Sequence, residues 1–280
     1  MSHFIITADT TFDLAPETVE RCQIVPIVSY VSLGDRMMDD YPDIQAQELF
    51  DYVARTGKLP QTAAANPADY ETAFRELREK DDRPIIHIAK SSGISSCYEN
   101  AVIAAREVKD VYVVDSKNVS GGSALTVVRA AESTLEDPKE LVADLEAYTK
   151  RIDCSFIIET LDFLYKGGRC SGLAAFGANL LKLRPEIIMD DGKMSPGKKY
   201  RGPYEKCVLS FIDEKLGNIE RFEPEQVYIN HTLQDPAMLD RIIGHIKAKN
   251  YFRNFVVYSV CAAVATHCGP NTFGIITVRK

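Results

Sequence analysis

Hydrophobic and polar positions follow two rhythms in the first half of the chain. Short, almost continuous apolar runs at residues 4–9, 84–89 and 111–115 predict buried strands. Helix starts follow these runs or lie between them, at Pro16, Asn66, Ser96 and Gly121. Strands that alternate with helices in this way pair in parallel through right-handed crossovers. The pattern therefore predicts a mainly parallel sheet, together with a further helix that is capped by Asp43 and ends at Gly57.

The second half has a different rhythm. A strand is expected at residues 154–160, and Asp190-Asp191-Gly192 lies between two extended runs, which is typical of a hairpin. Two helical pieces are expected around Gly167-Gly168-Arg169, the second of them over the Ala- and Gly-rich residues 171–181. A hairpin within an alternation of strands and helices predicts a mixed sheet.

The fold class that results is α/β, with two α/β domains. A charged helix near residues 137–151 separates the halves, so we place an N-terminal domain at 1–150 and a C-terminal domain at 151–280. The uncertainty of this boundary is about ten residues.

Composition and charge exclude several classes of protein. The chain of 280 residues is 45% hydrophobic and 26% charged, which is ordinary for a globular protein with a sizeable core. Its net charge of −7 argues against binding to nucleic acid. No apolar run approaches the roughly 18 residues of a transmembrane helix. The N-terminus lacks the basic region of a signal peptide, and seven scattered cysteines are typical of reduced thiols, so we expect a cytoplasmic protein.

One loop combines a buried strand, a Ser- and Gly-rich turn and a helix start, at residues 85–98. In a parallel sheet such a loop lies at the carboxyl end of the strand, where ligands usually bind. The free N–H groups of the helix favour a carboxylate or phosphate there. A plain helix cap at Ser95 is an equally good interpretation, and both uses rely on the same donors.

The same loop also permits an enzyme hypothesis. Gly93-Ile94-Ser95-Ser96-Cys97 begins like the G-x-S-x-G turn of serine hydrolases, although Cys97 replaces the last glycine. A Ser95–His267–Asp115 triad is the alternative function, hydrolysis of an acyl ester. A metal site at Cys261, His267 and Cys268 lacks an identifiable fourth ligand, so no metal is expected.

Two further stretches contain small residues. Thr62 precedes three alanines in a segment predicted to be a loop, which is either a plain linker or a place where a ligand approaches the backbone. The paired glycines before Arg169 permit an abrupt turn.

Taken in order, these pieces resemble the DegV family of fatty-acid-binding proteins, over essentially the whole chain. The resemblance rests on residues 9–14, Thr62, residues 91–95, residues 114–116, the Leu161–Arg169 segment and His267-Cys268-Gly269-Pro270.

The resemblance implies a long-chain fatty acid, such as palmitate (hexadecanoate), bound in an apolar slot between the two domains. Thr62, Ser95 and His267 are then expected to bind the carboxylate, with His267 in a loop before the last strand. Arg169 is expected to contact phosphate or a partner. The protein is expected to act as a lipid carrier that presents the carboxylate to a fatty acid kinase, and not as an enzyme. No cofactor is implied, and contact with a membrane surface is at most transient.

This chain departs from the family pattern at two places. Ser95-Ser96-Cys97 stands where the family usually has Ser-Gly-Thr, and Ser96 is expected to narrow the carboxylate end of the slot. Asn271 stands where the family usually has glycine. Because Asn tolerates a left-handed backbone better than most residues, that turn is expected to survive.

Three classes of function are thus distinguishable by experiment. A carrier binds fatty acid, a hydrolase turns over esters, and a purely structural or regulatory module does neither.

Overall fold

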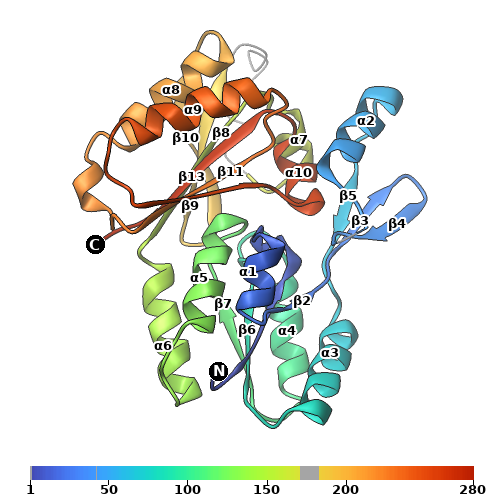
Figure 1. The fold of residues 1–280 in the computed structure, drawn as a ribbon. Helices are drawn as coiled ribbons and strands as arrows, with labels where there is room; N and C mark the ends of the chain where they lie inside the picture. The colour runs from blue at the N-terminus through green and yellow to red at the C-terminus, as the bar shows by residue number, and fades with distance from the viewer. Residues whose placement is uncertain (1, 42, 171–182) are drawn as a thin grey trace.

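A four-stranded parallel sheet organises the first half of the protein (Figure 1). The computed structural model describes residues 2–41, 43–170 and 183–280. The strand order is β2-β1-β6-β7, and every neighbouring pair is parallel. The strands are β1 (Ile5–Asp9), β2 (Val25–Ile27), β6 (Ile85–Ala89) and β7 (Val111–Asp115). The parallel pairing of all neighbouring strands confirms the predicted parallel sheet, and α1 and α4 form the crossovers from β1 to β2 and from β6 to β7.

Helices cover both faces of this sheet. They are α1 (Pro16–Arg21), α3 (Pro67–Lys80), α4 (Cys97–Ala105), α5 (Gly121–Ala131) and α6 (Pro138–Thr149), with a short 3-10 turn, η1 (Thr10–Phe12), after β1. Buried residues of α3 and α4 share one core cluster with Ile5 and Ile85. Those of α5 and α6 share another with Ile6 and Ile86. Since neighbouring residues of a strand point to opposite faces, α3 and α4 lie on one side of the sheet and α5 and α6 on the other.

The second half is built on a six-stranded mixed sheet of order β10-β9-β8-β13-β11-β12. Its strands are β8 (Ile152–Ile158), β9 (Arg184–Asp190), β10 (Lys193–Tyr200), β11 (Gln226–His231), β12 (Asn254–Ser259) and β13 (Thr272–Val278). Only the β11–β12 pair is parallel. The predicted hairpin is confirmed, with Asp191 and Gly192 at positive φ between β9 and β10.

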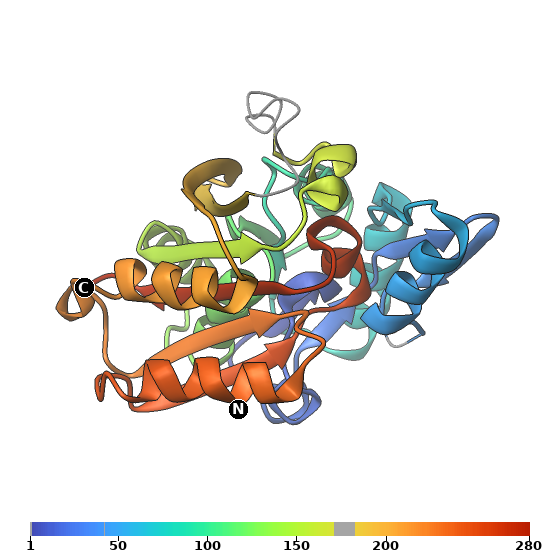
Figure 2. The same ribbon diagram turned by 90° about the horizontal axis from the view of Figure 1, so that it is seen from above.

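Two helices cover the outer face of this sheet. They are α8 (Tyr204–Lys215) and α9 (Pro236–Lys247), and they lie along the strands in Figure 2. Their buried side chains form one cluster with Ile157, Ile229 and Ile275. The opposite face, which includes Cys154, Tyr228 and Ile276, packs in the same cluster as α5 and α6. The two halves therefore share a hydrophobic core.

A smaller unit projects to one side of the first sheet (Figure 1). It contains the antiparallel strands β3 (Tyr30–Leu33), β4 (Arg36–Asp39) and β5 (Gln61–Ala63) together with α2 (Ala46–Thr56). Its core also includes residues of α10 (Ala262–Cys268), and α10 in turn contacts α7 (Asp162–Gly167). This small sheet was not predicted, because its strands are only three or four residues long.

The predicted N-cap of α2 at Asp43 is wrong. The helix begins two residues later, with Gln45 at the N-cap position. Ile44 and Leu49 flank the first turn and are buried in the same cluster. This hydrophobic staple, which joins the residue before the cap to the fourth helical residue, sets the start of the helix.

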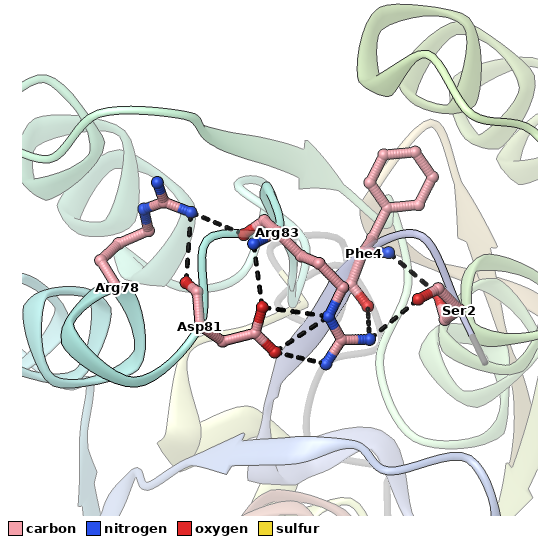
Figure 3. A network of polar contacts seen from close by, with 5 residues as sticks. All are labelled: Ser2, Phe4, Arg78, Asp81 and Arg83. Carbon is pink, nitrogen blue, oxygen red and sulfur yellow. Dashed lines mark hydrogen bonds and ion pairs between the residues drawn. The ribbon is translucent and has the colours of Figure 1, made fainter.

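Arg83 fixes the start of β1 against the end of α3 (Figure 3). Its guanidinium donates to Asp81 and to the carbonyl oxygen of Ser2, the latter at 2.8 Å. Arg78 donates to the carbonyl oxygens of Asp81 and Arg83. The network ties the amino-terminal end of β1 to the end of α3, at the end of the first sheet that lies away from the second half (Figure 1).

The working boundary near residue 150 lies between α6 and β8. The helix predicted over residues 171–181 lies outside the described residues. Among the helices that the structure describes, none combines the length and hydropathy of a membrane span.

Candidate functional site

A cavity lies between the two sheets. Its volume is about 310 Å³, which is within the range of about 300–1,000 Å³ for ligand pockets. The loops that follow β1, β6 and β7 contribute to its wall, as do β8, β11, β13 and α10. The carboxyl ends of the parallel strands thus form one side, which is where α/β sheets usually bind ligands.

Much of the wall is apolar. The apolar side chains come from both halves of the chain and include Ile94, Val119, Phe156, Leu164, Met194, Val264 and Ile276. Gly274 lies opposite Phe156 in the β8–β13 register and adds no side chain. Such a wall suits a hydrocarbon ligand, because removing apolar surface from water is favourable.

Thr62 and His267 form a hydrogen-bonded pair in the cavity wall. Thr62 lies on β5 and His267 lies in the last turn of α10, so the predictions of a loop at each position are wrong. Thr62 Oγ1 is 2.8 Å from His267 Nε2. The pairing of β5 with β3 and the packing of α10 on α2 explain why these segments are ordered elements.

The second ring nitrogen of His267 indicates which way this hydrogen bond runs. His267 Nδ1 is buried and has no hydrogen-bond partner in the described residues. An unpaired lone pair costs less than an unpaired N–H, so we assign the proton to Nε2, which donates to Thr62. The Thr62 hydroxyl then has its own proton available for a ligand in the cavity.

Burial keeps His267 neutral. Burial, together with the charges of Arg169 and Lys90, lowers the pKa of His267 to about 4. At neutral pH the imidazole therefore acts as a hydrogen-bond donor without charge.

Ser95 lines the cavity just before α4. Its hydroxyl accepts a hydrogen bond from Cys97 N at 3.3 Å and lies 3.3 Å from Cys97 Sγ. Ser96 occupies the N-cap position but makes no capping bond with its side chain. Both interpretations of Ser95 thus have support, since it caps the helix start and also faces the cavity.

Arg169 is exposed and contributes to the cavity wall. Its guanidinium donates to the carbonyl oxygen of Gly167 at 2.6 Å. Gly168 has a φ of 70°, which turns the chain after α7 as the paired glycines suggested.

Sequence reasoning missed Lys90 and Ser29. Both line the cavity, and Lys90 Nζ donates to Ser29 Oγ at 2.7 Å. A lysine directly after the apolar strand β6 was the available signal, because a buried strand end rarely carries a lysine.

The serine hydrolase triad is not assembled. Asp115 accepts hydrogen bonds from Ser92 and Lys117, and not from His267. His267 in turn contacts Thr62 instead of Ser95. Within the described ranges, no group of three metal-binding side chains was found.

The turn after α10 accommodates Asn271 in a left-handed conformation. Asn271 has a φ of 52°, which confirms the expected left-handed conformation. Its side chain donates to Glu159 at 2.6 Å and accepts from Gln234 N at 3.1 Å. The asparagine therefore replaces the flexibility of a glycine with two hydrogen bonds.

Known proteins are similar to this chain in sequence and architecture. A family model described as "uncharacterised protein, DegV family" matches residues 3–280. A DegV domain-containing protein of Caldanaerobacter subterraneus subsp. tengcongensis is 26% identical, with 100% of both chains covered. A fatty acid-binding protein of Thermotoga maritima is 26% identical, over 96% of this chain and 95% of that protein.

The solved structures agree with the sequence comparison. A fatty-acid-binding DegV family protein from Thermus thermophilus superposes with a TM-score of 0.90 at 25% identity, with 99% of both chains covered. Because the family model spans both sheets and the cavity between them, this chain belongs to the DegV family.

Proposed function

We propose that this protein binds a long-chain fatty acid, such as palmitate, in the cavity between the two sheets. The observation that carries the proposal is an apolar cavity whose wall also contains the hydrogen-bonded Thr62–His267 pair. The relatives from Thermotoga maritima and Thermus thermophilus are named as fatty-acid-binding proteins. The N-terminal domain (1–150) and the C-terminal domain (151–280) then form the two sides of the binding site.

The energetics favour this class of ligand. Burying about 14 methylene groups at ~0.8 kcal/mol each contributes on the order of 11 kcal/mol before ordering costs. The carboxylate must keep hydrogen bonds, because an unpaired buried charge is very costly. Thr62, Ser95 and His267 are the groups that we assign to the carboxylate end, with the Thr62 hydroxyl as the direct donor and His267 behind it.

Purified protein tests this proposal. We expect organic extraction and mass spectrometry to find a long-chain fatty acid, or the delipidated protein to take up added palmitate. A consistent absence of both would refute binding. Ester substrates provide the comparison with an enzyme, since turnover would support the hydrolase instead.

We further propose that the bound carboxylate is presented to a fatty acid kinase, which phosphorylates it with ATP. Arg169 supports this step, because an exposed guanidinium at the cavity wall suits a phosphate group or an acidic partner surface. We expect Arg169→Ala to slow acyl-phosphate formation by the cognate kinase much more than it weakens binding. Phosphorylation at the wild-type rate would exclude this role for Arg169.

A further inference from the structure

Lys90 is a buried cation at the cavity wall. It directly follows β6, and the residue is 8% exposed. The Lys90 backbone N–H donates to Asp9 Oδ2 at 2.8 Å, which fixes the residue at the strand end. Among the described residues it is the only lysine or arginine in the buried class. Such a charge needs a partner to offset the cost of removing it from water.

The ammonium group has an incomplete set of partners. It carries three donors, and Ser29 Oγ is its hydrogen-bond acceptor. In the part of the chain that the structure describes, no carboxylate oxygen lies within 4.0 Å of Lys90 Nζ. The remaining donors are therefore available to a ligand.

The nearby carboxylates are already engaged by other donors. Asp9 accepts from the Tyr70 hydroxyl at 2.5 Å and from Lys90 N. Asp40 accepts from Ala263 N at 2.6 Å and from Thr10 Oγ1 at 3.2 Å. The charges of Asp9 and Asp40 raise the pKa of Lys90, but neither carboxylate forms an ion pair with it.

Lys90 is charged under ordinary conditions. Burial by itself lowers the pKa of Lys90, but Cys97, Asp9 and Asp40 raise it, and the net pKa lies above the usual value. Lys90 also lies close enough to His267 to lower the pKa of that imidazole. The cation and the Thr62–His267 pair therefore belong to the same region of the cavity.

We infer that Lys90 is the counter-ion of the ligand's head group, so that the cavity selects ionised acyl ligands over neutral ones. The inference rests on the proposed fatty-acid function and deepens it. A carboxylate beside Lys90 completes an ion pair in surroundings where charge-assisted hydrogen bonds are strong. A neutral amide or alcohol of the same chain length leaves the ammonium without a counter-charge.

The test compares palmitate with palmitamide on delipidated protein. We expect the wild type to prefer palmitate, and Lys90→Met to reduce that preference by about 10- to 100-fold. Lys90→Gln keeps a donor without charge and should show the same reduction, whereas Lys90→Arg should retain most of the preference. Lys117→Met is the matched control, because Lys117 pairs with Asp115 at 3.0 Å and does not line the cavity.

The possible results separate the two proposals. An unchanged palmitate-to-palmitamide ratio in both Lys90→Met and Lys90→Gln would overturn the role of Lys90 while leaving fatty-acid binding intact. If the wild type binds neither ligand, the proposed function itself fails. The ratio of palmitate to palmitamide affinity can be measured on the wild type alone. Equal affinity for the two ligands would therefore overturn the inference even if the variants did not fold.

Discussion

At the scale of single residues, the cavity contains polar groups whose partners are arranged to leave donors free. With the proton assigned to Nε2, His267 donates to Thr62, and the hydroxyl proton of Thr62 is available for a ligand. Ser95 is less available to a ligand, because its hydroxyl already donates to Cys97 Sγ at 3.3 Å. We therefore expect Thr62 to contribute more to carboxylate binding than Ser95.

Removing both hydroxyls tests this assignment. A hydrogen bond to a charged group contributes about 1.5–3 kcal/mol, so Thr62→Ala should weaken fatty-acid binding by roughly tenfold or more. The Thr62→Ala, Ser95→Ala double variant should bind more weakly still, as measured by titration of delipidated protein. Wild-type affinity in a folded double variant would contradict the assignment, and a loss of thermal stability alone would identify both residues as structural.

His87 makes folding sensitive to pH. Its side chain is fully buried between Tyr70 and Phe74, and burial lowers its pKa to about 4. The folded state thus resists protonation, so this contribution to stability is complete above a pH of about 6.5 and is lost as the pH falls toward 4. The loss amounts to about 3 kcal/mol for this group.

A neutral substitute isolates this effect. Between pH 7 and pH 4, we expect the unfolding free energy of His87→Gln to gain about 3 kcal/mol relative to the wild type, as measured by urea denaturation. The difference between two proteins is needed because Asp13, whose pKa burial raises to about 6, acts in the opposite direction. His3→Gln is the control at an exposed histidine, and a pH-independent difference for His87→Gln would refute the prediction.

At the scale of elements, the Ser-rich loop after β6 is held by the β9–β10 hairpin. Ser91 Oγ donates to the carbonyl oxygen of Gly192 at 2.7 Å. A Cβ at Gly93 would lie 2.3 Å from the same oxygen. The hairpin turn of the second half therefore positions the loop after β6 in the first half, which lines the cavity.

Gly93→Ala should disrupt this contact. Because the clash is with backbone, the loop or the hairpin must shift, and we expect a loss of about 1–3 kcal/mol in stability together with weaker fatty-acid binding. Thermal denaturation and titration measure the two effects. Gly244→Ala in α9 is the control, since its Cβ would meet nothing within 4 Å and alanine favours a helix by about 1 kcal/mol. If the two variants had the same stability and the same fatty-acid affinity, the proposed role of the contact between this loop and the hairpin would be contradicted.

At the scale of the whole molecule, the two halves are joined by one core. Ile88 and Leu125 from the first half pack in the same cluster as Cys154 and Ile276 from the second. Separation of the halves would expose both faces. The cavity exists between them, so its shape depends on this packing.

We expect the protein to unfold in one cooperative transition. Circular dichroism and the fluorescence of the 13 tyrosines should give coincident curves in urea. Added palmitate should move both curves together to higher denaturant concentration, because a ligand that binds only the folded state stabilises it. Two separate transitions would show that the halves fold independently.

Local sequence signals were sufficient to predict most of the elements and the class of both sheets. Apolar runs such as Ile85–Ala89 and helix starts such as Asn66-Pro67 are local signals, as is the Asp191-Gly192 turn. Each depends on neighbouring residues, so periodicity and turn chemistry were sufficient. The family resemblance added an order of motifs that indicated a fatty-acid site.

The assembly of the site depends on contacts between residues that are far apart in the chain. Thr62 and His267 are 205 positions apart, and no local pattern predicts their contact. The short strand β5 exists because it pairs with β3, and α10 because it packs on its neighbours. Lys90 is buried beside Ser29, which lies 61 positions away in the chain, and no local pattern predicts that contact. Long-range pairing and burial are properties of the folded chain, which is why the wall of the cavity could not be derived from the order of residues alone.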